Sequence, residues 1–347
     1  MGAADLEAAV VGHDAPGHRT SRARQILAFA AVYVLWGSTF LAIRYAIATI
    51  PPFLMAGARH MLAGLILFPL ARLRSGERPT RANWGAALLM GALLLVIGNG
   101  GVSWAEQIVP SGVAALLVAT VSLWMVLLDW LRPGGMRPGR RVMAGLVLGF
   151  AGMALLVGPS GLFGGAGGAR VNPFGATVLV IASLSWATGS VHSRRLALPR
   201  SPLLGTAMQC LAGGTLLTLL GLLSGQGARF DWSSVSLRSA LALGYLVVFG
   251  SLLGFSAYTY LLGTAPPSRI ATYAYVNPVV ALFLGWAFAG ERLSLRTLSA
   301  AAVIIAAVVL VISSRQSRYP QKADSAAAQK TPAAVNNGLK TTTEVVP

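Results

Sequence analysis

The sequence predicts an all-α integral membrane protein with ten transmembrane helices, arranged as two inverted five-helix repeats. Of its 347 residues, 55% are hydrophobic and only 11% are charged, and the mean hydropathy is +0.68. Soluble domains carry about 25% charged residues, so the composition indicates a chain surrounded by lipid. Ten apolar runs and an internal repeat then give the number of helices and their arrangement.

Each of the ten apolar runs has approximately the length of a membrane-spanning helix. Such a helix needs about 20 predominantly apolar residues, with a range of roughly 17–25. The connections between the runs are short, as in a compact helical bundle, and the longest cover 159–172 and 225–239. The ten predicted spans are 26–46, 52–71, 84–104, 111–131, 142–158, 173–191, 203–224, 240–262, 267–289 and 297–313.

The basic residues predict which side of the membrane each connection faces. With a cytoplasmic N-terminus, 20 of the 27 basic residues lie on the cytoplasmic side and 5 on the other, while Arg44 and Arg59 fall inside spans. Because cytoplasmic connections are enriched in Lys and Arg, we expect a bacterial inner-membrane protein with both termini in the cytoplasm. Its predicted parts are a disordered N-terminal segment (1–24), a first repeat (25–160), a periplasmic linker (161–172), a second repeat (173–314) and a disordered tail (315–347).

The two halves of the chain resemble each other at an offset of 150 residues. Trp36 then aligns with Trp186, and residues 60–64 align with 210–214. Because each half has an odd number of spans, the second half enters the membrane upside down. Inverted repeats of this kind are the architecture of many transporters, whose solute site lies near the midplane where the repeats meet.

The ninth span carries a polar stretch that is costly in lipid. Residues 110–122 align with 266–278 at an offset of 156, and only the second of these segments contains Tyr273, Asn277 and Pro278. The tyrosine and the asparagine are four residues apart and share a helix face. The proline lacks an N–H and frees the carbonyl four residues before it. Such groups must line protein or a water-filled cavity, so the bend and the polar face are predicted for span nine alone.

Several short motifs resemble the EamA transporters of the drug/metabolite transporter superfamily. They are Trp36-Gly37-Ser38 in span one, Arg59 in span two, Tyr273–Pro278 in span nine and Gly290-Glu291-Arg292 after it. The sequence of residues 116–120, 128–135 and 139–159 is similar to that of the YedA-like exporters of the family. The resemblance covers roughly 26–313 and implies a central cavity that opens alternately to each side of the membrane. One departure is Ser122, where the first repeat usually has proline, and it leaves open whether span four bends.

The candidate binding residues are polar or aromatic side chains inside spans. A buried arginine such as Arg59 needs a partner or an anionic solute group; the alternative is a structural hydrogen bond to helix-end carbonyls. Paired mid-span tryptophans could form cavity walls that hold an apolar or cationic solute, or they could simply fill space. The predicted substrate-binding residues are Trp36, Ser38, Arg59, Asn99, Ser103, Gln107, Trp186, Tyr273, Asn277 and Pro278.

The end of span three is predicted to present a polar stripe to the interior. Asn99, Ser103 and Gln107 recur at intervals of four residues, whereas Glu106 faces another way and is expected among the lipid headgroups. None of the ten acidic residues is predicted near the bilayer midplane. Proton exchange through a carboxylate is therefore not supported, and downhill export or coupling through another group is expected.

Several other functions are disfavoured. The basic residues lie in short connections rather than on one folded face, which argues against nucleic-acid binding. A single cysteine, Cys210, allows no internal disulfide and no metal cluster, so neither a metal nor a cofactor is predicted. Motifs of phosphate-binding loops, zinc peptidases and serine hydrolases are absent from the sequence.

The sequence therefore predicts a secondary transporter rather than an enzyme. Its partners would be the lipid bilayer and a small solute, best guessed as an amino acid or a related amphipathic metabolite that is exported. A drug or quaternary-cation exporter of the same fold is one alternative, and a membrane-embedded lipid-modifying enzyme is another. The GxxxG pattern Gly145–Gly149 in span five is expected to pack within the chain, and the protein is predicted to be a monomer or a weak homodimer.

Overall fold

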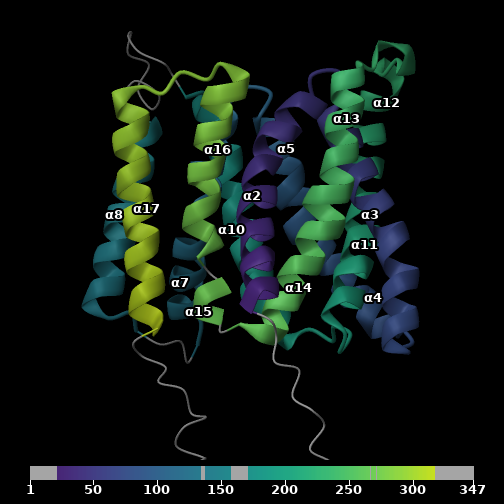
Figure 1. Cartoon of the computed structure of the whole chain (residues 1–347), viewed down its shortest axis with the longest axis horizontal. Coiled ribbons are helices and arrows are strands. Elements are labelled where there is room, and N and C mark those ends of the chain that lie inside the picture. Colours follow the sequence, from purple (N-terminus) through teal and green to yellow (C-terminus); the bar gives the residue numbers. More distant parts are fainter. Residues whose placement is uncertain (1–21, 134–136, 158–170, 266, 271, 317–347) are drawn as a thin grey trace, which may run out of the picture.

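The computed structural model describes residues 22–133, 137–157, 171–265, 267–270 and 272–316, and Figure 1 shows them as an upright bundle of helices. The predicted N-terminal segment, linker and tail lie mostly outside these residues. In chain order the elements are α2 (Arg22–Ala46), α3 (Pro52–Ser75), α4 (Arg81–Met90), η1 (Gly91–Gly100), α5 (Gly101–Ala105), α6 (Ser111–Ala119), α7 (Val121–Leu131), α8 (Arg140–Val157), α10 (Pro173–His192), η2 (Ser193–Arg195), α11 (Pro202–Leu223), α12 (Gln226–Arg229), η3 (Trp232–Ser234), α13 (Leu237–Tyr245), η4 (Leu246–Leu253), α14 (Gly254–Thr264), α15 (Pro267–Ile270), α16 (Tyr273–Ala289) and α17 (Leu295–Gln316).

The predicted all-helical membrane fold is confirmed. Within the described residues, nine helical stretches are long and apolar enough to cross a membrane, and the shorter Tyr273–Ala289 supplies most of span nine. Helices are expected here because backbone groups in lipid must be satisfied within their own segment. The chain enters at the start of α2 and leaves at the end of α17 on the same face of the bundle (Figure 1), as an even number of spans requires.

Several helices begin at a residue whose side chain caps the free backbone N–H groups of the first turn. Thr80 and Asn83 form a reciprocal capping box at α4. Asn172, Ser201 and Ser236 accept hydrogen bonds at the starts of α10, α11 and α13. The short connections thus fix where each span begins.

Span four is interrupted by one residue at Thr120, whereas Pro278 of span nine lies inside the continuous α16. The helix stops after Ala119, and Thr120 separates α6 from α7. The Thr120 hydroxyl donates to the Leu117 carbonyl at 2.5 Å. The Ser183 hydroxyl of span six lies 3.2 Å from the same oxygen and 2.8 Å from the Leu179 carbonyl of its own helix, so its single proton is divided between the two. Hydroxyl groups compete with the backbone for helix carbonyls, so these two side chains stabilise an interruption without proline. Ser122 stands in the first turn of α7, just beyond the break.

The third span of each repeat contains a long π-helical segment. These segments are η1 (Gly91–Gly100) in span three and η4 (Leu246–Leu253) in span eight. π-Helical turns are rare and occur frequently at functional sites. Because the two segments lie in equivalent spans of both repeats, we expect the functional site beside them.

Glycines hold α3 and α11, the second spans of the two repeats, in close antiparallel contact. A Cβ atom on Gly57 would lie 2.9 Å from the backbone nitrogen of Thr218, and one on Gly214 would lie 2.6 Å from that of Met61. Gly64 meets Leu211, and Gly221 meets Leu54, in the same way. Small residues allow this approach in lipid, where packing replaces the hydrophobic effect as the driving force.

These contacts are compatible with the predicted offset of 150, which pairs Gly64 with Gly214. They are equally compatible with an offset of 157, which pairs Gly57 with Gly214 and Gly64 with Gly221. The alignment of the second spans therefore stays a prediction.

Gly214→Ala is expected to lower the free energy of unfolding by about 1–3 kcal/mol, the usual cost of overpacking. The added methyl carbon would lie 2.6 Å from the Met61 backbone nitrogen, which cannot move without shifting α3. Gly85→Ala is the matched control, because that exposed helical glycine has nothing within 4 Å of a built Cβ. It should be neutral or slightly stabilising. Denaturation in detergent micelles measures both variants, and equal stability would contradict the packing described.

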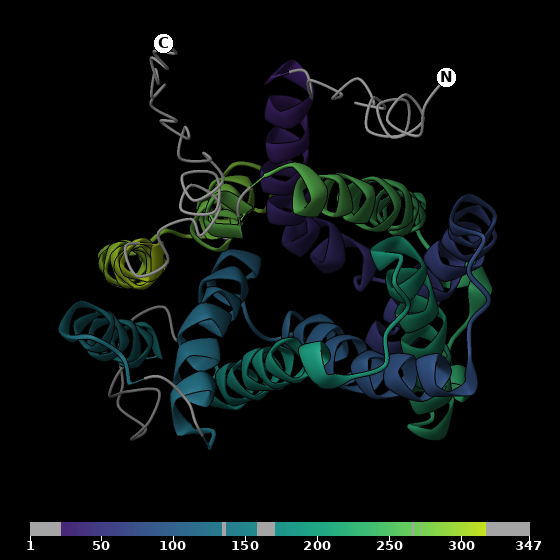
Figure 2. The same cartoon turned by 90° about the horizontal axis from the view of Figure 1, so that it is seen from below.

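The fifth spans of the two repeats also pair, at the edge of the bundle. Figure 2 shows α8 and α17 side by side, apart from the remaining helices. Gly145 and Gly152 of α8 face α17, where a Cβ atom would lie 2.7 Å from Val311 and 2.8 Å from Ile304, respectively. Gly149 faces Leu123 of α7. The predicted intramolecular use of the GxxxG pattern is confirmed.

Glu77 caps α11 from the connection that follows α3. Its two carboxylate oxygens accept the backbone N–H groups of Arg200 at 3.0 Å and Ser201 at 3.1 Å. These hydrogen bonds favour the ionised form and lower the pKa of Glu77. A carboxylate on one repeat thereby fixes the start of the equivalent helix of the other.

The Glu77 cap is expected to make stability depend on pH on the acid side. Because the pKa is lower in the folded than in the unfolded state, the stabilisation is complete above the unfolded value of about 4.3. It disappears as the pH falls through the lower folded value. Glu77→Gln should therefore be less stable than the wild type at pH 7, and the two melting temperatures should converge below about pH 4. A difference that stays constant between pH 7 and pH 3 would contradict the cap.

Candidate functional site

Trp36 of α2 packs directly onto the π-helical segment of span eight. Its indole Nε1 donates to the Gly250 carbonyl at 3.1 Å. A Cβ atom on Gly254 would lie 2.4 Å from the same nitrogen, so no side chain fits there. Trp36 of the first repeat therefore hydrogen-bonds to the Gly250 carbonyl of the second repeat and fills the space that Gly254 leaves open.

Arg59 of α3 reaches the next residue of the same segment. Its guanidinium is 5% exposed, and Nε donates to the Ser251 hydroxyl at 3.1 Å. In the described part of the chain, no carboxylate oxygen lies within 4.0 Å of this guanidinium. Its charge is therefore buried against a neutral hydroxyl, although a buried cation is costly without an anionic partner.

Trp186 of α10 occupies the equivalent place in the other half of the molecule. Its ring lies 3.0 Å from the position of a Cβ on Gly98, in the π-helical segment of span three. The neighbouring Ser185 donates to the Leu93 carbonyl of that segment at 2.8 Å. The first span of each repeat therefore supports the π-helix of the opposite repeat, which explains why the two tryptophans align.

Each residue of the Trp36-Gly37-Ser38 motif has a separate contact. Gly37 lets α16 approach, since a Cβ there would lie 2.7 Å from the side chain of Val280. The Ser38 hydroxyl forms a hydrogen bond of 2.7 Å with the Tyr245 hydroxyl, at the end of α13. With Trp36 on the π-helix, the motif joins span one to spans eight and nine.

The polar stretch of span nine lies against span one. The Tyr273 ring meets Trp36 edge-on, with 5.4 Å between ring centroids, and the Tyr258 ring lies 5.1 Å from Trp36. Asn277 is buried beside Pro278, and its side-chain nitrogen donates to the carbonyls of Tyr33 and Tyr273 once the amide is oriented to suit its neighbours. Trp36 and span nine are therefore in contact, rather than being opposite walls of a cavity.

The predicted polar stripe of span three is only partly present. Asn99 is half-buried and Ser103 is fully buried, but Gln107 is exposed and its amide donates to the Trp104 carbonyl at 3.0 Å. Glu106 is 2% exposed, and the prediction that it lies among lipid headgroups is wrong. The π-helical turns before Asn99 and the end of α5 after Ser103 alter the four-residue period on which both predictions depended.

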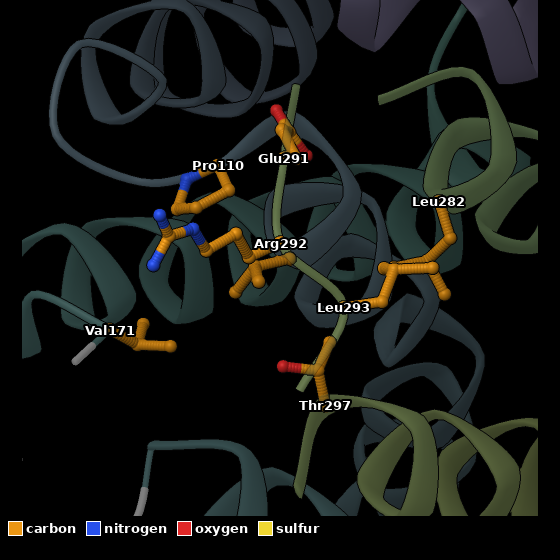
Figure 3. Close-up of a pocket in the computed structure, with 8 residues that line it drawn as sticks. Pro110, Val171, Leu282, Glu291, Arg292, Leu293 and Thr297 are labelled. Carbon is orange, nitrogen blue, oxygen red and sulfur yellow. The ribbon is translucent and has the colours of Figure 1, made fainter. Parts of the chain in front are cut away.

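Glu291 ties together the upper ends of several spans. Its carboxylate accepts the backbone N–H groups of Ser111 at 2.7 Å and Gly112 at 3.0 Å and the Ser111 hydroxyl at 2.7 Å, and so caps α6. Arg44 of α2 lies 3.5 Å away. Figure 3 shows Glu291 and the adjacent Arg292 pointing to different sides of a small recess beside Pro110. None of the predicted binding residues lines this recess.

The ten predicted residues fall into two groups. Spans one, two, eight and nine bring together Trp36, Ser38, Arg59, Tyr273, Asn277 and Pro278. Trp186, Asn99 and Ser103 gather at the other π-helix, and Gln107 joins neither group. The sequence reasoning missed Gly250, Ser251 and Tyr258 in span eight; comparison of the third spans of the two repeats could have indicated them, since Gly101 and Ser103 match Gly254 and Ser256.

Ten spans in two inverted repeats, with buried polar groups where the repeats meet, define a membrane transporter. The chain belongs to the EamA-like transporter family, whose family model matches residues 23–158 and 173–313. It is 40% identical over 278 residues to the inner membrane transporter YedA of Escherichia coli K12, covering 79% of this chain and 87% of YedA.

Two more distant relatives and a solved structure agree with this placement. The chain is 25% identical to the transporter YvbV of Bacillus subtilis 168, covering 80% of this chain and 88% of YvbV. It is 26% identical to a protein of Salmonella typhimurium LT2 named as a probable amino-acid metabolite efflux pump, covering 78% and 88% of the two chains. One crystal structure superposes with a TM-score of 0.56 at 22% identity, over 83% of this chain and 97% of the other, which supports the fold.

Proposed function

We propose that this transporter exports small metabolites that carry a carboxylate, with amino acids as the first candidates. The observation that supports this most is the buried Arg59, whose guanidinium has a neutral hydroxyl as its hydrogen-bond partner. A solute carboxylate would supply the missing negative charge, and guanidinium binds carboxylates in a bidentate geometry. The name of the relative from Salmonella typhimurium points to the same class of solute.

The transport cycle would alternate access around the two π-helical segments. The site is formed by side chains of both repeats, so a rocking of one repeat against the other changes its exposure. Trp36 and Tyr273, in contact here, would separate as the lower side opens. The solute would bind between Arg59 and the rings of Trp36, Tyr258 and Tyr273.

A cationic solute is the second candidate, and the same rings support it. Trp36, Tyr258 and Tyr273 lie within about 6 Å of one another, with centroid distances of 5.1, 5.4 and 6.1 Å. Aromatic rings grouped in this way hold quaternary ammonium ions through cation–π interactions. Arg59 opposes such a solute by repulsion, which is why the carboxylate is preferred.

A counterflow assay in sealed proteoliposomes tests the proposal. The vesicles are loaded with one amino acid, one dicarboxylate or one quaternary ammonium compound, and uptake of a trace of the labelled compound is followed. Accumulation of carboxylate solutes is expected. Accumulation of the quaternary cation alone would overturn the carboxylate proposal in favour of the second candidate. Conversion of lipid in detergent, without transport, would instead indicate an enzyme.

The remaining proposals concern placement in the membrane. We place the termini in the cytoplasm, with the repeats covering about 25–160 and 173–314, in an inner membrane as for YedA. A fluorescent protein fused after residue 347 should fluoresce, because it folds in the cytoplasm. A fusion protein that is expressed but does not fluoresce would contradict this orientation and place the C-terminus outside the cytoplasm.

A further inference from the structure

Glu106 is a buried carboxylic acid. The residue directly follows α5, which Figure 1 shows toward the upper end of the bundle, and it is 2% exposed. Among the described residues neither of its carboxylate oxygens accepts a hydrogen bond of normal geometry, although the Arg44 backbone lies close to the group. An isolated ionised carboxylate in such a place is so costly that the group neutralises instead. The carboxyl therefore holds a proton in this conformation.

The charges that face Glu106 come from three neighbouring elements. Arg44 of α2, Arg59 of α3 and Glu291 after α16 act on the carboxyl electrostatically. Arg44 already lies 3.5 Å from the Glu291 carboxylate, and Arg59 is hydrogen-bonded to the Ser251 hydroxyl. Glu291 repels a second negative charge while the two arginines attract it. In this arrangement Arg44 acts on two carboxyl groups, that of Glu106 and that of Glu291.

Further unsatisfied polar atoms continue from Glu106 into the bundle. The hydroxyl of Ser103, one turn earlier in span three, and both ring nitrogens of His60 are buried without partners. The amide of Asn99 is close to the His60 ring but not in hydrogen-bonding geometry. Sites with several polar partners are where buried water is found. The row runs from Glu106 toward Arg59, the residue next to His60.

We propose that Glu106 is a proton-binding site whose occupancy depends on whether the upper end of the bundle is closed. With that end closed, the carboxyl keeps its O–H bond. When spans one, three and nine separate there, the O–H bond breaks and the proton passes to water. The carboxylate that remains is balanced by Arg44, released from Glu291.

The consequence for transport rests on the proposed function. If the chain exports carboxylate solutes by alternating access, opening of the upper end would exchange a proton in each cycle, and export would be coupled to proton movement. The protonation itself needs no solute. It can therefore be tested separately.

Infrared spectroscopy of the full chain in lipid nanodiscs, with ¹³C-labelled glutamate, tests the site without a solute. At pH 7 the wild type should show the C=O band of one protonated glutamic acid, shifted by the label. Glu106→Gln and Glu106→Met should both lose the band. The methionine variant is included because an apolar side chain suits a buried, unpaired position and should fold. Glu77→Gln, which removes a half-buried carboxylate that accepts two backbone N–H groups, should keep the band.

A fourth variant tests the link to closure. Glu291→Ala frees Arg44 and loosens the upper end, so the band should weaken or vanish at the same pH. The proposal is overturned if the wild type has no such band, if the band survives in both Glu106 variants, or if it is unchanged in Glu291→Ala. Absence of amino-acid counterflow with all three infrared results as expected would count against the proposed function alone.

Discussion

Arg59→Gln is expected to transport carboxylate solutes about 10- to 100-fold more slowly than the wild type. The amide can still donate to Ser251, 3.1 Å from the native Nε, so the contact between spans two and eight is kept. What is lost is the charge, and a hydrogen bond to a charged group contributes about 1.5–3 kcal/mol. Since each 1.4 kcal/mol is tenfold, this range gives the expected slowing. The initial rate of counterflow in proteoliposomes is the measurement.

Two comparisons separate loss of the charge from damage to the fold. Arg59→Lys keeps the charge but cannot form a bidentate pair, so its rate should fall between wild type and Arg59→Gln. Arg238→Gln removes an exposed arginine at the start of α13, which lies 3.6 Å over the Tyr45 ring and, within the described residues, forms no hydrogen bond or ion pair with a predicted binding residue, and it should transport normally. Arg59→Gln at the wild-type rate, with a lysine variant no different, would show that the arginine is structural.

The helices could be predicted from the sequence because lipid leaves the chain few choices. Every spanning segment must be apolar and must satisfy its own backbone, so hydropathy alone located ten spans. The relative register of the repeats was less constrained. Gly57, Gly64, Gly214 and Gly221 fit the alignment at more than one offset, and the antiparallel contacts across the helix pair are compatible with each of them.

The candidate site was predicted in part, for a definite physical reason. Trp36 and Arg59 stood out as polar or aromatic groups inside spans, which lipid makes rare. Their contacts with Gly250 and Ser251 depend on a π-helix, and the periodicity of the sequence does not predict a π-helix there. Its carbonyls are stabilised by side chains from the opposite repeat, such as the Trp36 indole. The same local change of period explains why Glu106 was assigned to the headgroups.

The interruption of span four illustrates a similar limit. Sequence reasoning associated a break with proline, and Ser122 replaces the expected proline. The helix is interrupted at Thr120, whose hydroxyl bonds to the Leu117 carbonyl, and the Ser183 hydroxyl, 63 residues further along the chain, lies 3.2 Å from the same oxygen. A pattern read within one span cannot contain a partner that arrives from another.

Glu291→Ala should lower the free energy of unfolding by about 3–5 kcal/mol, the usual cost of breaking a buried charged network. Its carboxylate is 6% exposed and receives two backbone N–H groups, one hydroxyl and the nearby Arg44. Without it, the first turn of α6 loses its cap and Arg44 loses its partner. The loss of the cap occurs at a carboxylate that is 6% exposed, so solvent does not readily repair it, whereas Arg44, 37% exposed, keeps access to water.

Glu291→Gln and Glu77→Gln make this prediction specific. The glutamine at 291 keeps one acceptor oxygen but presents an NH₂ group to the second backbone N–H, so its loss of stability should lie between wild type and Glu291→Ala. Glu77 accepts two backbone N–H groups, those of Arg200 and Ser201 just before α11, but it is only half-buried, so water reaches it more easily than Glu291. Its variant should therefore unfold closer to the wild type. If denaturation in detergent micelles showed the two glutamine variants equally destabilised, burial would not be what makes the Glu291 cap strong.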